Sequence, residues 1–357
     1  MIIDELINLP SVLERIRAEK LPIFLYGMGN GAEKIHAYLS LHGIEIKGVV
    51  ASDGFVRGQD FLGFRVVSVT DAEKSYGRLC LVLCFGLEGE KSHFLKNLQK
   101  RHHVISPNLA VFGDGACDKE YILSNIDYFE KVYGIFDEPE SKTLYLNILK
   151  YNITGDISYL EYGNELPAPS GFFNHSARHI DVGAYDGDTV AEFISYNKNY
   201  SDIVAFEPDK STFLKLKRNV SSVRDCIAVN AAVAKKSGSI SFASGGGRAS
   251  HCGEGEQIIS ASIDEFVGFT HIAAEGIPVG SIKIDAEGMD EDVICGAVNT
   301  IYCCKPSVCV ALYHRAEDIV LLPLLLRKHN PKYRFYLRKK EYVPAWDVFL
   351  YAVPEGR

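Results

Sequence analysis

The segment from Arg178 to Pro208 constrains the fold of this chain more than any other stretch. It reads RHIDVGAYDGDTVAEFISYNKNYSDIVAFEP, in which two short apolar runs flank a glycine-containing turn and an amphipathic helical pattern. Gly183 and Gly187 allow the backbone to turn sharply and allow a ligand to lie against bare peptide. The pattern therefore predicts a strand, a tight turn, a helix that begins near Thr189 and a second strand, which together form a βαβ unit.

Acidic side chains around this turn indicate the kind of ligand. Asp181 ends the first strand, Asp186 and Asp188 lie in the turn, and Glu207 ends the second strand. A carboxylate at the end of the second strand can accept hydrogen bonds from both hydroxyls of a ribose. Because turns that hold phosphate are kept free of acidic side chains, we predict a ribose-containing ligand without phosphate.

Further motifs follow these two in a familiar order. DVGAYDGDT and AFEP are succeeded by ASIDEF, then IKIDAEGMDEDVICGA, then a strand that ends at His314. This ordered set, which covers about half of the chain, resembles the FkbM family of S-adenosylmethionine-dependent methyltransferases. The resemblance implies S-adenosyl-L-methionine as cofactor. It also implies that the strands YRFYLR and WDVFLYAVP form the antiparallel pair that closes a class I methyltransferase sheet.

The cofactor-binding residues follow from the βαβ pattern and the resemblance together. The turn and the end of the second strand supply most of them, and the strand CIAVNAAVA ends where an apolar side chain can stack on adenine. The predicted set is Asp181, Gly183, Ala184, Asp186, Gly187, Thr189, Glu207, Pro208, Asn230, Ala231 and Asp285.

A second charged stretch, SIKIDAEG at 281–288, carries candidate catalytic groups. Lys283, Asp285 and Glu287 alternate along a predicted strand, so we expect them on one face, at the sheet edge that carries the acids of the βαβ unit. Pairing of Lys283 with a neighbouring acid is the structural alternative, and it is compatible with a contact to the acceptor. The next strand, SVCVALYH, ends at His314, where the resemblance also places a histidine.

Methyl transfer to a hydroxyl requires a base, because an aliphatic hydroxyl is too weak an acid to ionise beforehand. His314 is the first candidate, with an expected pKa near 6–7. Asp285 or Glu287 would orient it or replace it. A divalent ion held by these carboxylates could instead lower the pKa of the hydroxyl, but no repeated His/Asp spacing supports a metal site, so none is predicted.

The resemblance implies an O-methyltransferase that acts on a hydroxyl of a sugar or glycan-related acceptor in bacterial polysaccharide or secondary-metabolite biosynthesis. The glycine-rich stretch SGGGRASHCGEGEQ is interpreted either as a plain hairpin connection or as a lid whose Arg248 and His251 contact the acceptor.

A second glycine motif lies near the N-terminus. Gly27, Gly29 and Ala32 match G-x-G-x-x-A after the strand IFLY, and Asp53 follows about twenty residues later, as in a ribose-binding unit. Two interpretations remain open. A nucleotide or nucleotide-sugar contacts Gly27, Gly29, Gly31 and Asp53, or the glycines serve only a tight turn and close helix packing. The stretch GFVRGQDFLGFRVVSV, which follows Asp53, resembles the N-terminal nucleotide-binding-like domain of bacterial polysaccharide-modifying proteins.

Two other functions compete with methyl transfer. The first is an NAD(P)-dependent nucleotide-sugar oxidoreductase or epimerase that uses the GMGNGA motif, although no catalytic tyrosine–lysine pair or cysteine constellation accompanies it. The second is a non-catalytic binding module whose sheet merely retains the fold.

Length and pattern predict two domains, since 357 residues exceed the roughly 250–300 residues of a single core. We predict a Rossmann-like domain at 1–113, a helical connector at 114–172 and an FkbM-type domain at 173–357. The fold class is α/β, a class I methyltransferase Rossmann-like sheet preceded by a second, smaller Rossmann-like domain. An amphipathic helix at 2–19, restarted near Ser11, begins the chain.

Composition excludes several classes of partner. The 38 basic and 46 acidic residues give a net charge of −8, which favours neither nucleic acid nor an anionic membrane. The apolar runs at 79–85 and 319–326 are shorter than the roughly 20 residues of a membrane span. The start of the chain lacks a secretory signal pattern, and the nine cysteines form no CxxC pair, so we expect a cytoplasmic protein. The expected partner is a small-molecule or glycan acceptor, and homo-oligomerisation stays open.

Overall fold

The structure, a computed structural model, describes residues 1–89, 92–112, 115–173, 176–243, 251–252, 255–269 and 276–356. The chain divides into two compact units. Unit 1 comprises Met1–Tyr133, Lys142–Leu166 and Lys339–Asp347, and unit 2 comprises Gly134–Ser141, Pro167–Arg338 and Val348–Arg357. The segment expected as a connector, 114–172, thus contributes to both units. Arg248 and the side chain of His251, expected in a lid, lie outside the described residues.

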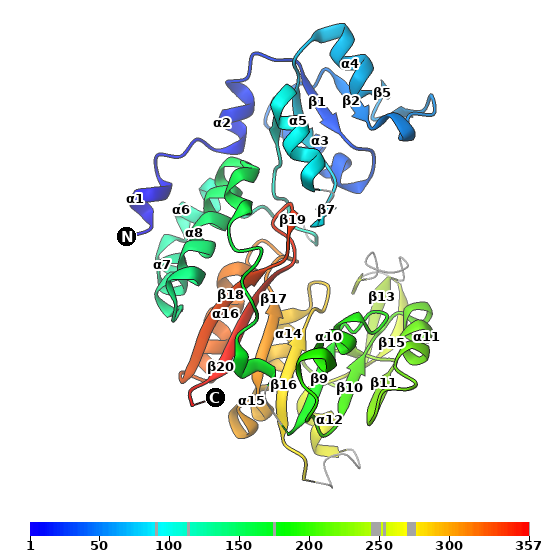
Figure 1. Ribbon diagram of the computed structural model, residues 1–357, viewed down its shortest axis with the longest axis vertical. Helices are drawn as coiled ribbons and strands as arrows, with labels where there is room; N and C mark the ends of the chain where they lie inside the picture. Colours follow the sequence, from blue (N-terminus) through cyan, green and yellow to red (C-terminus); the bar gives the residue numbers. More distant parts are fainter. Residues whose placement is uncertain are drawn as a thin grey trace. The chain divides into compact units, whose positions relative to one another are not determined.

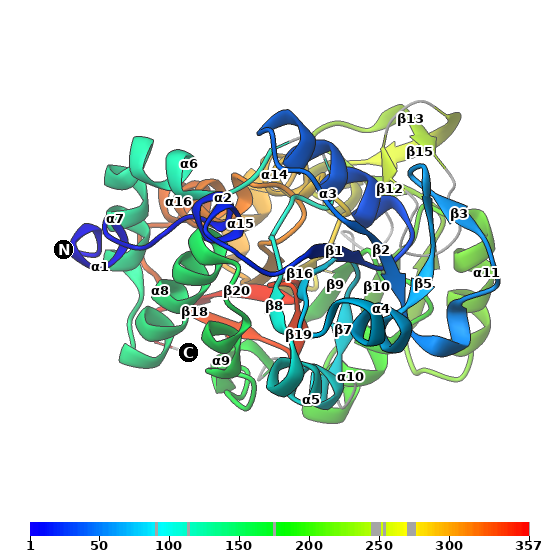
Figure 2. The same ribbon diagram turned by 90° about the horizontal axis from the view of Figure 1, so that it is seen from above.

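Unit 1 is built on a five-stranded parallel sheet. Its order is β5-β2-β1-β6-β8, with bounds β1 (Ile23–Tyr26), β2 (Gly48–Ala51), β5 (Val67–Ser68), β6 (Cys80–Leu83) and β8 (His103–Ile105). Every residue of β2 and β6 is buried, as both faces of a parallel sheet require. Helix α3 (Asn30–Leu41) packs on β1 (Figure 2), and α4 (Val69–Tyr76) and α5 (Ser92–Arg101) contact β2 and β8.

The N-terminal helical pattern forms two helices, α1 (Ile3–Leu6) and α2 (Val12–Arg17). The restart predicted near Ser11 is a capping box. The Ser11 hydroxyl accepts from the backbone N–H of Glu14, and the Glu14 carboxylate accepts from the backbone N–H of Ser11 at 2.6 Å. Val12 and Ile16 join the core of unit 1, so α2 covers this core. Further along the chain lie α6 (Lys119–Ser124), α7 (Ile126–Ile135) and α8 (Pro139–Thr154).

Unit 2 contains a seven-stranded sheet, drawn from green through red in Figure 1. Its order is β11-β10-β9-β16-β17-β20-β18. The bounds are β9 (Arg178–Val182), β10 (Ile203–Phe206), β11 (Cys226–Val229), β16 (Val279–Ile284), β17 (Ser307–Ala311), β18 (Tyr333–Lys339) and β20 (Val348–Pro354). The first five strands pair in parallel, whereas β20 runs antiparallel to β17. The two strands predicted to close the sheet, YRFYLR and WDVFLYAVP, are therefore neighbours at its edge as β18 and β20.

Alternate side chains of β10 face two helical layers. Ile203 and Ala205 pack with α10 (Asp188–Tyr196) and α11 (Lys210–Asn219), whereas Phe206 contacts Phe266 of α12 (Ile263–Phe269) at a ring-centroid distance of 5.0 Å. Helix α16 (Asp318–His329) contacts both α14 (Asp290–Cys295) and α15 (Val298–Cys304), and α15 also contacts α12. The sheet thus has the two covered faces of a doubly wound fold.

Smaller elements complete the described chain. A four-stranded sheet in the order β12-β15-β13-β14 contains β12 (Ala232–Val233), β13 (Gly238–Ala243), β14 (His251–Cys252) and β15 (Glu256–Ala261). The segment between β18 and β20 belongs to unit 1, where β19 (Tyr342–Val343) pairs antiparallel with β7 (Leu87–Glu88). Within the described ranges, no helix has both the length and the apolar character needed to cross a membrane.

A buried ion pair anchors the start of β9. Nε and Nη2 of Arg178, which is 0% exposed, donate to the two carboxylate oxygens of Asp202 at 2.7 and 2.8 Å. We expect Asp202→Ala to destabilise unit 2 by roughly 3–5 kcal/mol, because it leaves the guanidinium buried without its counter-ion. Thermal unfolding measures this loss. Asp60→Ala removes the exposed pair to Arg65 and should cost less than about 1 kcal/mol. Equal shifts in the two variants would contradict the assignment.

Candidate active site

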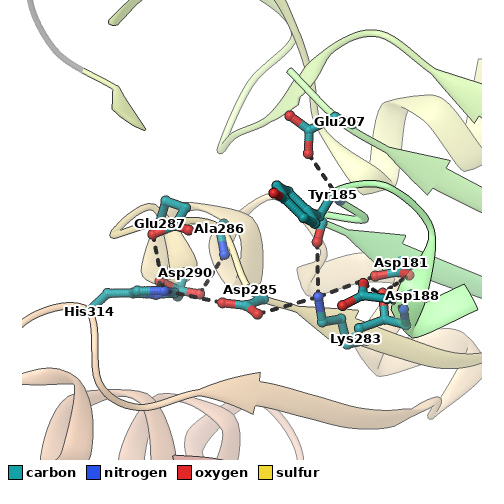
Figure 3. Close-up of polar contacts among 12 residues, drawn as sticks. Asp181, Tyr185, Asp188, Glu207, Lys283, Asp285, Ala286, Glu287, Asp290 and His314 are labelled. Carbon is teal, nitrogen blue, oxygen red and sulfur yellow. Dashed lines mark hydrogen bonds and ion pairs between the residues drawn. The ribbon is translucent and has the colours of Figure 1, made fainter. Parts of the chain in front are cut away.

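The carboxyl ends of four neighbouring strands bring the predicted charged residues together (Figure 3). Asp181 lies on β9, Glu207 follows β10, and Lys283 lies on β16 with Asp285 just beyond its end. His314 lies three residues beyond the end of β17. The strand expected over 281–288 ends earlier, since β16 stops at Ile284. Asp285 and Glu287 follow it and still lie near His314 in the same cluster.

The turn after β9 accepts only glycine at position 183. Gly183 has φ +72°, and a Cβ there would lie 1.9 Å from the carbonyl oxygen of Asp285. The turn therefore passes in direct backbone contact with the end of β16. Tyr185 also has a positive φ, +49°, and this conformation lets its N–H donate to Oε2 of Glu207 at 3.1 Å.

Glu207 is buried, with 7% exposure. Its Oε1 accepts from the N–H of Asp209 at 2.8 Å, and its Oε2 accepts from Tyr185, so each oxygen keeps a lone pair for a further donor. Burial raises the pKa of Glu207 to about 7, against the opposing effect of these two backbone hydrogen bonds.

The other predicted cofactor residues lie around the same turns. Asn230 donates from Nδ2 to the carbonyl oxygens of Glu207 and Pro208 at 2.9 and 3.0 Å, and so fixes the end of β10. Ala231 is 4% exposed. The remaining members, Ala184, Asp186, Gly187, Thr189 and Pro208, occupy the turns after β9 and β10 or the first turn of α10.

The ammonium of Lys283 lies at the centre of this cluster. Its Nζ donates to the carbonyl oxygen of Gly183 at 3.0 Å and lies 3.5 Å from a carboxylate oxygen of Asp181 and of Asp285. Burial alone would lower the pKa of Lys283, but the two carboxylates outweigh it and raise that pKa. Its three protons face three acceptors, so the structural pairing left open by the sequence is present.

Asp181 is fully buried and also receives a hydrogen bond from the hydroxyl of Thr189 at 2.6 Å. Burial raises the pKa of Asp181, and the Lys283 ammonium opposes this effect. The hydrogen bond between Thr189 and Asp181 joins the start of α10 to the end of β9 and therefore stabilises the turn between them.

His314 is surrounded by carboxylates. Its Nδ1 lies 2.8 Å from Asp290, and its Nε2 lies 3.2 Å from Asp285 and 3.5 Å from Glu287. Burial alone would lower the pKa of this histidine, but Asp290 and Asp285 raise it well above the ordinary value. The expected pKa near 6–7 is therefore wrong. The imidazolium form, with both ring N–H groups directed at carboxylates, cannot accept a proton.

The carboxylates beside His314 differ from each other. Burial raises the pKa of Glu287 to about 7, an effect that the His314 imidazolium opposes and that Asp285 and Asp290 reinforce. The side chain of Glu287 is 32% exposed, so solvent and small molecules can reach it. Burial also disfavours ionisation of Asp285, but Lys283 and His314 outweigh burial and hold its pKa well below the usual range.

Sequence reasoning missed several members of the site. Asp290, 1% exposed, accepts from the N–H groups of Ala286 and Gly288 as well as facing His314. Tyr313 donates from its hydroxyl to Asp285 at 3.1 Å. Asp290 is the first acid of DEDV, a pattern typical of an ordinary helix start. Tyr313 is an aromatic residue just beyond a strand, a position that predicts no particular function. The sequence alone therefore did not indicate the role of either residue.

Asp318 is a second buried acid near His314. Burial raises its pKa to about 7, and the neighbouring Asp290 adds to this shift. Ligand atoms of Asp290, His314 and Asp318 lie within 4.8 Å of one another, a spacing that would suit a metal ion. Asp290 already accepts three hydrogen bonds and Asp318 accepts from the N–H of Arg315 at 2.8 Å, so the geometry is that of a hydrogen-bonded cluster.

The glycine motif of unit 1 has a different environment. A Cβ on Gly27 would lie 2.7 Å from the ring of Phe85, and one on Gly31 would lie 2.4 Å from the carbonyl oxygen of Cys84, whereas Gly29 has open space. Asp53 lies in a short 3-10 helix, Asp53–Phe55, and its carboxylate accepts from Thr70. Close packing thus explains two of the three glycines.

Comparison with known proteins decides the family of unit 2. Residues 181–344 match the family model described as the methyltransferase FkbM domain. Unit 2 carries an FkbM methyltransferase domain. The recognised span begins at Asp181 and includes every predicted cofactor and catalytic residue, so this part of the chain is a methyltransferase.

One solved methyltransferase structure shares the fold over nearly its whole length, and two others are similar over about half of this chain. The crystal structure of methyltransferase FkbM from Methylobacillus flagellatus KT has a TM-score of 0.70 and 18% identity, covering 98% of this chain and 97% of that chain. Fibrillarin from Aeropyrum pernix, with bound S-adenosyl-L-methionine, has a TM-score of 0.32 and 11% identity, covering 54% of this chain and 71% of its own. A methyltransferase of Streptococcus mutans in complex with SAH has a TM-score of 0.34 and 8% identity, covering 52% of this chain and 92% of its own. No curated protein matches the sequence.

The raised pKa of His314 gives a spectroscopic test. In NMR titrations we expect the ring of His314 to remain an imidazolium well above the ordinary histidine pKa of about 6.5, because its neighbouring carboxylates raise the pKa. Asp290→Asn removes the nearest carboxylate, so the ring should lose its proton at a lower pH. Asp292→Asn, an exposed change on the same helix, should leave the titration unaltered. A normal titration in the unmodified protein would contradict this description.

Proposed function

We propose that unit 2 transfers the methyl group of S-adenosyl-L-methionine to a hydroxyl of a sugar or glycan-related acceptor, as in polysaccharide or secondary-metabolite assembly. The observation that carries the proposal is the buried Glu207 at the end of β10, beside the turn that only Gly183 permits, within a methyltransferase domain. The two free lone pairs of its carboxylate suit the two hydroxyls of a ribose.

The acids of the first turn favour a cationic donor. Asp186 and Asp188 lie where a phosphate-binding turn would be uncharged, and S-adenosyl-L-methionine carries a sulfonium and an ammonium instead of phosphate. The bare backbone at Gly183 and Gly187 gives the donor room to lie close to the chain.

The reaction is an in-line displacement in which an acceptor oxygen attacks the sulfonium methyl group. Charge is neutralised during this step, so alignment and removal of the hydroxyl proton supply most of the acceleration. Glu287 suits the role of base, because a pKa of about 7 leaves it largely able to accept a proton near neutrality and its side chain is accessible.

The other charged groups orient the carboxylates and do not transfer a proton themselves. The His314 imidazolium lies 3.5 Å from Glu287 and 3.2 Å from Asp285, so it orients both carboxylates. Lys283 holds Asp285 from the other side at 3.5 Å. Asp285, ionised between these two cations, is placed to accept a hydrogen bond from the acceptor hydroxyl.

Incubation with S-adenosyl-L-methionine labelled in its methyl group tests the reaction itself. A panel of sugars, sugar nucleotides and oligosaccharides serves as acceptors. We expect label in a sugar ether together with formation of the demethylated nucleoside. Transfer to a nitrogen or to a nucleic acid alone would overturn the proposed acceptor class.

Donor binding should depend on pH through Glu207. The ribose hydroxyls favour the ionised carboxylate, whereas the free protein binds a proton there below about pH 7. Affinity for the donor should therefore rise between about pH 6 and about pH 8, by up to about tenfold. Glu207→Gln should bind roughly 10–100-fold more weakly than the unmodified protein at about pH 8, since charged hydrogen bonds are lost, and its affinity should not change with pH. Calorimetry measures both, and a flat profile in the unmodified protein would refute the assignment.

Turnover should depend on Glu287. Glu287→Gln removes the base and should lower turnover roughly 10²–10⁴-fold, with donor affinity little changed. The unmodified rate should rise with pH through about 7 as Glu287 loses its proton. His314→Asn removes a cation that lowers the pKa of Glu287, so the midpoint of this profile should move to higher pH.

Glu291→Gln, at an exposed position on helix α14 just after Glu287, is the matched control and should be neutral. If Glu287→Gln keeps normal turnover while His314→Asn abolishes the pH dependence, the base is His314 and not Glu287.

A further inference from the structure

Unit 1 contains a cavity of about 470 Å³ among α2, α3, α6, α8 and the segment that follows β8. All of the residues that line it belong to unit 1. Its volume lies within the roughly 300–1,000 Å³ of pockets that bind small molecules. The cavity is therefore large enough to hold a small molecule, and its polar groups indicate which kind.

Asn152 is a buried polar residue that lines this cavity and keeps one unused donor. The residue, on α8, is only 5% exposed. Its Oδ1 accepts a hydrogen bond from Nδ2 of Asn108 at 2.8 Å. Among the residues that the structure describes, Nδ2 of Asn152 donates to no group, yet it is not sealed off from the cavity. Because buried donors are nearly always paired, this group favours an oxygen that enters the cavity.

The two bonded amides leave one donor and one acceptor for a ligand. Nδ2 of Asn152 is the donor, and Oδ1 of Asn108, which also lines the cavity, is the acceptor. A hydroxyl both donates and accepts, so a pair of neighbouring hydroxyls can satisfy both amides at once. A phosphate or carboxylate only accepts, and it would leave Oδ1 of Asn108 without a donor.

Two rings of α3 add an aromatic wall. Tyr38 and His42 are one helical turn apart, with ring centroids 4.7 Å apart and an interplanar angle of 56°. Nδ1 of His42 lies 2.7 Å from the carbonyl oxygen of Tyr38, and this contact fixes the imidazole. Burial, together with the neighbouring Asp118, raises the pKa of Tyr38 to about 12, so its hydroxyl stays protonated. Aromatic carbon beside a polar hydroxyl suits a sugar ring, which carries both C–H and O–H groups.

The charged groups around the cavity do not favour an ionic ligand. Both signs line it, as Glu14, Arg17, Asp118, Lys119 and Glu120. Lys119 donates to the carbonyl oxygen of Leu9 at 2.7 Å and lies 3.8 Å from Glu14. Nη2 of Arg17 donates to the carbonyl oxygen of His42 at 2.9 Å. Each cation is therefore engaged by the protein itself, and the uncharged amides and rings are the groups left for a ligand.

We propose that this cavity binds a neutral saccharide, with hydroxyls at the amides of Asn108 and Asn152 and a sugar ring against Tyr38. The site is separate from the methyl-donor residues, all of which lie in unit 2. Saccharide binding in unit 1 does not depend on methyl transfer in unit 2, so each function can be measured without the other.

Saturation-transfer NMR on the full-length protein tests the site with defined sugars. Maltose is the neutral probe, glucuronate is the anionic probe, and glucosamine is the cationic probe. We expect saturable transfer to the protons of maltose at millimolar concentration, and weaker transfer to the two charged sugars. Stronger binding of either charged sugar would overturn the neutral assignment, and no transfer to any of the three would overturn the site.

Two substitutions test the contacts, and thermal melting verifies that each variant is folded. Tyr38→Leu keeps an apolar side chain but removes the ring, and Asn152→Ala removes the unused donor, so each should weaken maltose binding about tenfold. Tyr128→Ala removes an exposed tyrosine of α7 outside the cavity and should bind maltose normally. Normal maltose binding in both cavity variants would refute the assignment.

Donor affinity separates this proposal from the methyl-transfer proposal. Tyr38→Leu and Asn152→Ala should bind S-adenosyl-L-methionine as the unmodified protein does, because both residues belong to unit 1. Glu207→Gln should show the opposite pattern, with weakened donor binding and normal maltose binding. Loss of maltose binding in Glu207→Gln, with normal binding in the two cavity variants, would place the saccharide in unit 2 and overturn the proposed site.

Discussion

The ammonium of Lys283 is the interaction on which the candidate active site depends. It joins the turn after β9, through Gly183 and Asp181, to the end of β16, through Asp285. Removing this charge would leave two carboxylates near each other in a buried setting, where unpaired ions are costly. The same contact sets the ionised state of Asp285, and Asp285 in turn faces His314. The turn after β9 and the charged groups around His314 are therefore joined by one continuous set of charge interactions.

Much of this arrangement was predictable from the sequence. Glycine positions, strand-like apolar runs and acids at strand ends place Asp181, Glu207, Asp285 and His314 at one sheet edge, because parallel strands share a carboxyl edge. The protonation state of His314 was not predictable. It depends on Asp290, which comes from the start of a helix and not from a strand end, and pattern alone does not reveal which acids meet a buried ring. A sequence gives neighbours along the chain, whereas a pKa depends on neighbours in space.

Exposure separates the groups that can move a proton from those that cannot. His314 and Asp290 are buried and face each other, so their charges are fixed by mutual attraction. Glu287 has a left-handed backbone, φ +49°, and its side chain is partly exposed within the same cluster. Backbone strain at such a residue persists only where the surroundings enforce it, and such residues concentrate at functional sites.

The two glycine motifs of this chain show that glycine spacing indicates close backbone packing but does not by itself indicate a ligand site. At Gly183 the space of a side chain is filled by the backbone of β16, and an acid at the next strand end is buried with free acceptor sites. At Gly27 the equivalent space is filled by the ring of Phe85, and Asp53 lies apart on a short helix. Both glycines are required for close packing. Ligand chemistry is therefore indicated by the polar groups beside the turn and not by the glycine spacing itself.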